Sequence, residues 1–437
     1  MINLESEKGK KIGVFGLART GTAAYVALKE VAKVICFDDN ASNRKAFEST
    51  YGDSASALLD IEDTAWRHLD YIILSPGVPL HFPVPHRIVS LAKEYNIPLI
   101  SDIEVLFRTL SKKNYIGVTG TNGKSTTTAL IGHILGKDFE VGGNIGIPAL
   151  ALQEEARGFI LELSSYQLDL LYDFKPKVAV LLNITPDHIE RHGSLEGYIE
   201  SKKRIWQNMG EGDALVIGVD NDVTCSIHKQ LLREGVAFEL IPISINKDST
   251  DLPCNNFLQG LHNKENTLAA YATAKALGYS DEYIRSKIES FEGLKHRMQF
   301  VGTYKNISFY NDSKATNAES ASKSIGSLEN IYWIAGGVAK EGGIESLVPL
   351  FSRISKAYLY GEAREVFAKT LEGRVNFVIC NSMQEAFDLA LKDALHSNAC
   401  ANILLAPACA SFDQFKDFEE RGEVFISLAR KVIADNH

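Results

Sequence analysis

The chain has 437 residues, 45% of them hydrophobic and 23% charged, with a net charge of −9 at pH 7. This composition is ordinary for a globular protein of two to four domains, and the negative charge argues against a nucleic-acid binder with a broad basic face. The chain has no signal-peptide core, no apolar run of the roughly 20 residues that cross a bilayer and no C-x-x-C pair among its six cysteines, so we expect a soluble cytoplasmic protein with reduced thiols.

Short apolar runs alternate with helix-like segments almost throughout the chain. Continuous apolar strands separated by helices indicate parallel sheets covered on both faces, and therefore an α/β protein with more than one sheet. Crossings near 93–102 and 293–302 divide the chain into three predicted domains, 1–98, 99–297 and 298–437. The predicted strands are 11–16, 33–38, 70–77, 115–120, 158–165, 177–185, 330–337, 356–361, 375–380 and 402–408.

The first strand runs into GVFGLARTG (13–21), where Gly16, Ala18 and Gly21 give G-x-A-x-x-G. A dinucleotide fingerprint needs a second glycine where this chain has Ala18, so a redox dinucleotide is disfavoured. Asp38 closes the second strand, where an acid that contacts ribose often lies. A helix N-terminus can still hold a phosphate, so two interpretations stay open: a nucleotide or nucleotide-sugar site, or tight strand–helix packing alone.

The stretch GVTGTNGKST (117–126) follows an apolar strand and opens a helix. The usual phosphate loop would have a further glycine two residues before Gly120, where this chain has valine. Gly120 and Gly123 can still turn backbone N–H groups inward, Lys124 can reach terminal phosphate oxygens, and Ser125 lies where a hydroxyl ligates Mg²⁺. The sequence therefore predicts nucleoside-triphosphate binding.

Polar groups close the next two predicted strands. Glu162 ends the first and can hold Mg²⁺, or can pair with a lysine as a strand-end carboxylate. Asp187 and His188 follow the second, at the edge where open α/β sheets bind ligands. They are candidates for a metal or substrate contact, although a lone histidine can equally be structural.

Two helical segments carry further candidates. In YIESKKRIW (198–206), adjacent lysines usually indicate a solvated face, and the residues alone make neither lysine catalytic. In GLHNKENTLAA (260–270), Asn263 and Asn266 at a helix start can cap that helix or contact a purine. In the third domain, polar side chains that follow apolar strands would line one edge of a sheet: Arg297, Asp312, Lys314, Lys340 and Ser411.

Together these motifs resemble the Mur ligases over nearly the whole chain. TGTNGKST is the family's form of the phosphate loop, and GGNIG, ELSSYQL, DH, HN..N and HR recur in that order. NDSKATN (311–317) and PACASFDQF (407–415) are similar to the members that add D-glutamate. The resemblance implies three domains: a Rossmann-like N-terminal domain for a UDP-sugar, a central P-loop ATPase-like domain for ATP, and a Rossmann-like C-terminal domain for the amino acid.

The resemblance also implies roles for individual residues. Those implied to bind ATP are Gly120, Thr121, Asn122, Gly123, Lys124, Ser125, Thr126, Asn263, Asn266, Arg297 and Asp312. Those implied to bind D-glutamate are Lys314, Thr316, Lys340, Ser411, Phe412 and Phe418. Those implied to bind the UDP-muramoyl substrate are Arg19, Thr20, Asp38, Ser75, Gly77 and Asn144. The implied catalytic residues are Lys124, Glu162, His188 and a carbamylated lysine, which by its place after Tyr198 is most like Lys202, with Lys203 the alternative one residue on; Ser125, Glu162, His188 and the carbamate of Lys202 would ligate two Mg²⁺ ions.

The implied reaction is an ATP-dependent ligation in peptidoglycan-precursor synthesis, with an acyl phosphate formed on the alanine carboxylate of UDP-N-acetylmuramoyl-L-alanine and captured by the amine of D-glutamate. The expected partners are these small molecules, with no nucleic acid and no membrane, and the expected state is a monomer. A non-catalytic nucleotide-sugar binder is the alternative from another class, and it would be expected to lose the loop or metal ligands. A folyl-polyglutamate synthase-like ligase, or another Mur ligase, is the alternative among ligases, and it would lack NDSKATN and PACASFDQF.

Overall fold

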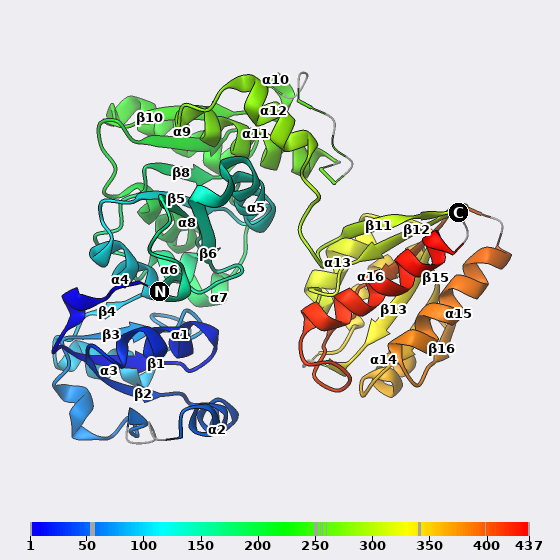
Figure 1. The fold of residues 1–437 in the computed structure, drawn as a ribbon, viewed down its shortest axis with the longest axis horizontal. Coiled ribbons are helices and arrows are strands. Elements are labelled where there is room, and N and C mark those ends of the chain that lie inside the picture. The colour runs from blue at the N-terminus through cyan, green and yellow to red at the C-terminus, as the bar shows by residue number, and fades with distance from the viewer. Residues whose placement is uncertain are drawn as a thin grey trace. The chain divides into compact units, whose positions relative to one another are not determined.

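A computed structural model describes residues 2–52, 57–248, 252–253, 255, 257–258, 260–339, 342–397 and 399–435. The chain forms two compact units, residues 1–291 and 292–437, and each is built from parallel or mostly parallel sheets with helices on both faces, together with one short antiparallel pair in the second unit (Figure 1). The predicted α/β class is therefore confirmed. The two predicted domain boundaries remain predictions.

The first sheet is parallel, with strand order β2-β1-β3-β4. Helices α1 and α2 pack on the face that carries Val14 and Cys36, and α3 packs on the face that carries Phe15 and Ile35. Its elements are η1 (Glu5–Glu7), β1 (Lys11–Phe15), α1 (Arg19–Leu28), β2 (Lys33–Phe37), α2 (Ala41–Thr50), η3 (Thr64–Arg67), β3 (Tyr71–Leu74), α3 (Arg87–Glu94) and β4 (Leu99–Ile100).

The second sheet is also parallel, with order β10-β9-β8-β5-β7-β6. Helices α5, α11 and α12 cover one face, and α8 and α9 cover the other. The elements are α4 (Asp102–Thr109), β5 (Asn114–Thr119), α5 (Lys124–Leu135), η4 (Gly136–Asp138), β6 (Phe139–Gly143), η5 (Ala149–Ala151), β7 (Gly158–Glu162), α6 (Ser165–Leu168), β8 (Val178–Leu181), α7 (Ile189–His192), α8 (Leu195–Lys203), η6 (Arg204–Trp206), β9 (Ala214–Gly218), α9 (Asp222–Glu234), β10 (Glu239–Ile243), α10 (Ile245–Asp248), α11 (Leu261–Ala276) and α12 (Asp281–Glu289).

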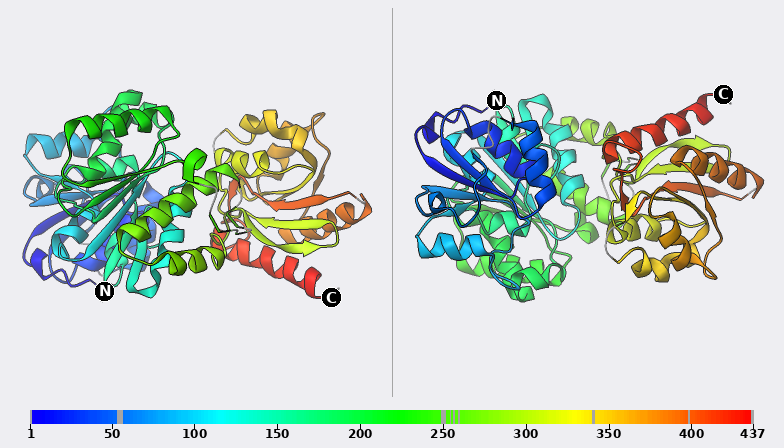
Figure 2. Two further views of the ribbon diagram at one scale, coloured as in Figure 1. Left: turned by 90° about the horizontal axis from the view of Figure 1, so that it is seen from above. Right: turned by 90° about the horizontal axis from the view of Figure 1, so that it is seen from below.

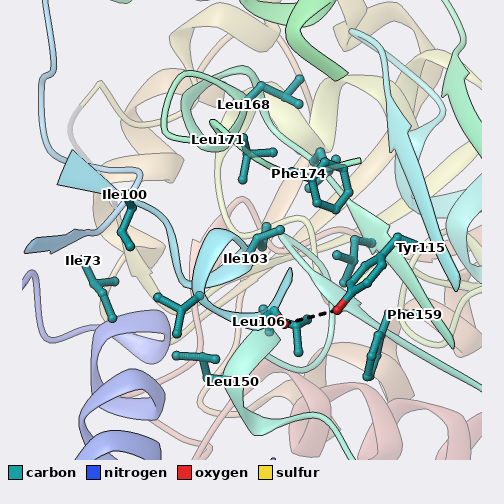
Figure 3. Close-up of a cluster of buried hydrophobic side chains, with 14 of the residues drawn as sticks. Ile73, Ile100, Ile103, Leu106, Tyr115, Leu150, Phe159, Leu168, Leu171 and Phe174 are labelled. Carbon is teal, nitrogen blue, oxygen red and sulfur yellow. Dashed lines mark hydrogen bonds between the residues drawn. The ribbon is translucent and has the colours of Figure 1, made fainter. Parts of the chain in front are cut away.

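One hydrophobic core joins these two sheets. Ile73 of β3 and Ile100 of β4 belong to the same buried cluster as Ile103 of α4 and Tyr115 of β5 (Figure 3). The Tyr115 hydroxyl is satisfied within this core, because it donates to the Leu106 carbonyl at 3.2 Å. Burial of a shared apolar surface explains why residues 1–291 form a single compact unit.

The second unit contains a six-stranded sheet of order β11-β12-β17-β13-β15-β16, in which only the β11–β12 pair is antiparallel, and a small β14–β18 pair. Helices α13 and α14 cover one face and α15 and α16 the other, and Figure 2 shows the red α16 and the gold α14 on opposite faces. The elements are β11 (Gln299–Tyr304), β12 (Ile307–Asn311), α13 (Ala318–Gly326), β13 (Ile331–Gly336), β14 (Val338–Ala339), η8 (Glu345–Arg353), β15 (Ile354–Tyr360), α14 (Arg364–Leu371), β16 (Phe377–Ile379), α15 (Met383–His396), β17 (Ala401–Leu405), β18 (Cys409–Ala410) and α16 (Phe418–Ala434).

All ten predicted strand regions contain a strand, but several predicted ends are wrong. The run 158–165, for example, ends as a strand at Glu162, because Ser164 caps α6 through a capping box with Gln167. The predicted runs do not include the strands β4, β6, β9, β10, β11, β12, β14 and β18. No helix in the described part of the chain is long and apolar enough to span a membrane.

Candidate active site

The phosphate loop connects β5, which lies between β8 and β7, to helix α5. Gly123 is the N-cap of α5 at φ +83°, and a Cβ there would lie 2.2 Å from Asn266 Oδ1, so the position requires glycine. Lys124 Nζ donates to the carbonyls of Gly120 (3.0 Å) and Thr121 (2.9 Å). The loop thus encloses its own lysine at a helix N-terminus, where backbone N–H groups favour an anion.

The two asparagines of α11 lie directly behind this loop. The capping alternative is wrong, because Gly260 is the N-cap of α11. Asn266 is buried; its Oδ1 accepts a hydrogen bond from Thr127 Oγ1 at 3.2 Å, and its Nδ2 donates to Asn263 Oδ1 at 3.0 Å. Asn266 therefore ties α11 to α5. The purine contact stays a prediction.

Glu162 is the last residue of β7, and only one of its two carboxylate oxygens accepts a hydrogen bond from the described residues. The residue is 3% exposed, and its Oε1 accepts a 2.7 Å hydrogen bond from Asn144 Nδ2. Its Oε2 is buried with no hydrogen-bond partner among the described residues. Burying a carboxylate oxygen without a hydrogen-bond partner costs free energy unless a ligand binds it. A hard cation such as Mg²⁺ is the ligand that suits a carboxylate oxygen. The buried Ser125 hydroxyl, at the start of α5, adds a second oxygen of the kind that Mg²⁺ accepts.

The two adjacent lysines of α8 have different surroundings. Lys202 is 1% exposed, and its Nζ donates to the Gly120 carbonyl at 2.8 Å and lies 4.6 Å from the centroid of the Tyr198 ring. Burial, and then the charge of Lys124, lower the pKa of Lys202 well below 10.5. Lys203 is partly exposed and pairs with Glu200 at 2.8 Å. The solvated-face interpretation therefore fits Lys203 only, and the lowered pKa of Lys202 favours the neutral amine that carbamylation requires.

His188 is held in an unusual backbone conformation. It is the N-cap of α7 at φ +53°, a region that non-glycine residues rarely occupy and that often marks a functional position. Its half-exposed imidazole lies 3.6 Å from Asp187 Oδ2 and 3.8 Å from Glu190 Oε1, and its ring centroid is 5.1 Å from that of Tyr166. The imidazole is thus available to a ligand, as the metal prediction requires.

Of these groups, Lys124, His188 and Lys202 line one cavity of about 290 Å³, whereas Ser125, Glu162 and the two asparagines of α11 are not among its lining residues. Five of the predicted site residues line it: Gly77, Lys124, Asn144, His188 and Lys202. Sequence reasoning missed the other five: Pro76, Ser164, Ser165, Tyr166 and Tyr198. A signal existed for most of them, because the two serines and Tyr166 closely follow Glu162 at a strand's carboxyl end, and Tyr198 stands one helical turn before Lys202.

Three of the predicted UDP-side residues follow strands of the first sheet: Asp38 follows β2, and Ser75 and Gly77 follow β3. Asn144 follows β6 of the second sheet. Arg19 and Thr20 are the first residues of α1, and the Arg19 guanidinium donates to the Gly146 carbonyl. Ser75 Oγ donates to the Gly16 carbonyl at 2.9 Å. These contacts join the turn after β1 to the turn after β3 and to the loop that carries Asn144.

The buried Asp38 carboxylate supports the turn after β1. It accepts the backbone N–H groups of Leu17 (2.5 Å) and Asn40 (2.7 Å) and the side-chain amide of Asn43 (3.0 Å). The carboxylate thus fixes the geometry of the G-x-A-x-x-G turn, as the tight-packing interpretation requires. Its contact with a UDP group stays a prediction.

In the second unit, the predicted residues gather where β12, β17 and β13 end, because these parallel strands share a carboxyl edge. Buried Asp312 accepts a hydrogen bond from Ser324 Oγ, and burial raises its pKa. Lys314 Nζ lies 5.8 Å from the centroid of the Phe418 ring. Arg297 precedes β11 and Thr316 follows β12 in the same turn as Lys314.

The remaining predicted residues of this unit differ in exposure. Ser411 is buried, whereas Phe412 is 75% exposed. Lys340 lies outside the described residues. Sequence reasoning missed buried Arg421, which donates to the Ser313 carbonyl at 2.7 Å and to the Cys409 carbonyl at 3.2 Å. Arg421 therefore fixes the two loops that carry the predicted D-glutamate residues relative to one another.

Comparison with known proteins agrees with this arrangement. Residues 118–258 match the Mur ligase middle domain, and residues 296–409 match the Mur ligase glutamate ligase domain. A protein named UDP-N-acetylmuramoylalanine--D-glutamate ligase from Rickettsia felis is 50% identical to this chain, and the match covers 98% of both chains. A protein of the same name from Caulobacter vibrioides is 43% identical, and the match covers 97% of this chain and 96% of that protein. Among solved structures, UDP-N-acetylmuramate-alanine ligase MurC from Thermotoga maritima has a TM-score of 0.58 at 17% identity, covering 97% of this chain and 99% of that one, which supports the fold. The chain belongs to the Mur ligase family.

Proposed function

We propose that this chain joins the amine of D-glutamate to the alanine carboxylate of UDP-N-acetylmuramoyl-L-alanine, using ATP and releasing ADP and phosphate, in peptidoglycan-precursor synthesis. The observation that carries the proposal is the cavity between Lys124 of the phosphate loop and Gly77 of the loop after β3. A phosphate donor and a substrate held by the first sheet would meet there. Relatives named for this activity match nearly the whole chain at 43% and 50% identity.

In the first step, a carboxylate oxygen attacks the γ-phosphorus of ATP and ADP leaves, which gives an acyl phosphate. The chain's contribution is to position the reactants and to stabilise charge. The N-terminus of α5 and Lys124 would meet the phosphate oxygens. Lys124 can turn from the two loop carbonyls that it now contacts to a phosphate without leaving the loop.

The site fits Mg²⁺ ions, and two are proposed. Ser125 and Glu162 would hold one, and His188 and carbamylated Lys202 the other; bound there, the ions would offset charge on the phosphoryl oxygens. In the described part of the chain, no three His, Cys, Asp or Glu side chains gather as a metal site. Phosphate and water would therefore complete each shell, which is usual for Mg²⁺.

In the second step, the D-glutamate nitrogen attacks the acyl carbon, the C–O bond to phosphate breaks, and the nitrogen loses a proton. The amino acid carries two carboxylates and needs cations, which Lys314 and Lys340 would supply with Thr316, Ser411, Phe412 and Phe418. Asn263, Asn266, Arg297 and Asp312 are proposed to bind the nucleotide. Arg19, Thr20, Asp38, Ser75, Gly77 and Asn144 are proposed to bind the UDP-muramoyl group.

We place the reaction in the cytoplasm. All five described cysteines are free, as is usual for cytosolic proteins. The expectation of a monomer stays a prediction, which sedimentation can test.

Phosphate release tests the proposed activity. The purified chain is given ATP, Mg²⁺ and UDP-N-acetylmuramoyl-L-alanine, together with D-glutamate, L-glutamate, L-lysine or meso-diaminopimelate in parallel reactions. Release that depends on D-glutamate alone is expected. Release that depends on one of the other amino acids would overturn the specificity, and no release with any of them would overturn the ligase activity.

A further inference from the structure

Part of the cavity lining comes from the first sheet. Pro76 and Gly77 follow β3, whereas Lys124, His188 and Lys202 belong to elements of the second sheet. The cavity keeps its shape only if the loop after β3 is held against the second sheet. The side chain that does so carries no role in the reaction described above.

Arg191, in α7, makes that connection. Its Nη1 donates to the Gly77 carbonyl at 3.1 Å, and its Nη2 donates to the Val78 carbonyl at 2.9 Å and the Pro76 carbonyl at 3.4 Å. One planar guanidinium thus spans three successive carbonyls, a pattern that its fork of donors suits and that an ammonium group cannot reproduce.

The guanidinium is itself fixed by stacking. Its Cζ lies 4.5 Å from the centroid of the Tyr166 ring, which lines the cavity. A second neighbour of that ring in α7 is His192, stacked at 5.5 Å between centroids with 13° between the planes. His192 is buried, and its Nε2 lies 2.9 Å from the hydroxyl of Ser165, which also lines the cavity. Two adjacent residues of α7 therefore contact Tyr166.

We propose that Arg191 is a positioning residue that fixes Pro76–Val78 against the cavity, so that the substrate carboxylate meets the phosphate loop in reactive geometry. This inference rests on the proposed function, in which the loop after β3 contacts the UDP-muramoyl group. Arg191 contacts the loop after β3 and Tyr166, and none of these contacts involves the phosphate loop. Its loss therefore perturbs the sugar substrate and leaves ATP binding unchanged.

The test compares Arg191→Ala and Arg191→Lys with Arg204→Ala. Arg204 is a matched control, because its Nε donates to the Leu168 carbonyl at 2.9 Å and its Cζ lies 5.7 Å from the centroid of the Tyr172 ring, but neither Leu168 nor Tyr172 lines the cavity. Steady-state kinetics are measured against each substrate. Amide exchange by mass spectrometry is measured on the substrate-free proteins.

For Arg191→Ala, kcat/KM for UDP-N-acetylmuramoyl-L-alanine is expected to fall about 10²-fold, the scale of a misplacement of about 1 Å, with KM for ATP within about twofold. Arg191→Lys retains a charge, so its kcat/KM for the sugar substrate should lie between the values of the wild type and Arg191→Ala. This variant also provides the test if the alanine variant fails to fold. Peptides covering 75–80 should exchange faster in both Arg191 variants. Arg204→Ala should match the wild type in both measurements.

An equal rise of KM for ATP and for the sugar substrate, or kinetics and exchange that match the wild type, would overturn the positioning role. So would the same split of KM values in Arg204→Ala. A wild-type chain that releases no phosphate contradicts the proposed function instead. In that case the exchange of residues 75–80 still decides whether Arg191 fixes the loop.

Discussion

Replacing Lys202 with methionine separates a catalytic role from a structural one. Methionine keeps an unbranched side chain in the buried position and removes the amine that would be carbamylated. Lys203→Met is the matched control, because it makes the same change at the adjacent, partly exposed residue. If the carbamate completes a metal site, kcat in Lys202→Met should fall about 10²–10³-fold, the usual loss when one preorganised charge-stabilising group is removed.

The structure predicts that the same change leaves the fold intact. The Gly120 carbonyl keeps its 3.0 Å hydrogen bond from Lys124, and Thr119 Oγ1 still donates to the Leu163 carbonyl at 2.8 Å. No buried polar group therefore loses its last partner. Burial holds the pKa of Lys202 well below 10.5, so an amine that is costly to bury is replaced by an apolar group. The free energy of unfolding of Lys202→Met should equal or exceed that of the wild type.

The pH dependence of urea unfolding, measured in buffer free of CO₂, checks this reasoning. Between the native pKa of Lys202 and the unfolded value near 10.4, the unfolded chain binds more protons, so wild-type stability rises with pH. The stability of Lys202→Met lacks that rise with pH, so its excess free energy of unfolding over the wild type should vanish above about pH 10.5. Lys203→Met should lose only an exposed ion pair worth about 0–1 kcal/mol and keep full activity. Full activity in Lys202→Met, or inactivation by Lys203→Met alone, would refute the assignment.

Three further substitutions test other contacts. Gly123→Ala should raise KM for ATP and lower the melting temperature, because its Cβ would meet Asn266 Oδ1 at 2.2 Å. Gly136→Ala is the control: Gly136 has φ +71° but no atom within 4 Å of an added Cβ, so this variant should show only the smaller backbone cost in thermal unfolding. Asn144→Ala should raise the Mg²⁺ concentration for half-maximal activity about 10–100-fold, because Asn144 orients Glu162; an unchanged Mg²⁺ titration would contradict that role. Burial raises the pKa of Asp102 from 3.8 to about 6. The free energy of unfolding in urea of Asp102→Asn should therefore exceed that of the wild type by up to about 3 kcal/mol above pH 6 and should equal it below about pH 4. A difference independent of pH would contradict the titration of Asp102.

Local patterns predicted the strands and the phosphate loop because both depend on neighbouring residues. The valine before the loop is buried in β5, and the turn uses Gly120 and Gly123, as the sequence suggested. The resemblance favoured Lys202 over Lys203, but the burial of Lys202 needed the structure, because it depends on packing against the phosphate loop. Arg191 has no local signal, since the three carbonyls to which it donates are more than 100 residues away in the sequence. Roles that depend on contacts between sheets are those that sequence patterns miss.

The two lysines of the cavity suggest how the site is prepared for an anion. Lys124 and Lys202 donate to the same Gly120 carbonyl, at 3.0 and 2.8 Å. Two full charges on one buried carbonyl would repel strongly, and the charge of Lys124 accordingly contributes to the low pKa of Lys202. The lowered pKa favours the neutral form of Lys202, which carbamylation needs, and leaves Lys124 to carry the charge that would meet phosphate. Carbamylation would turn Lys202 from a competitor of Lys124 into an anion that attracts it.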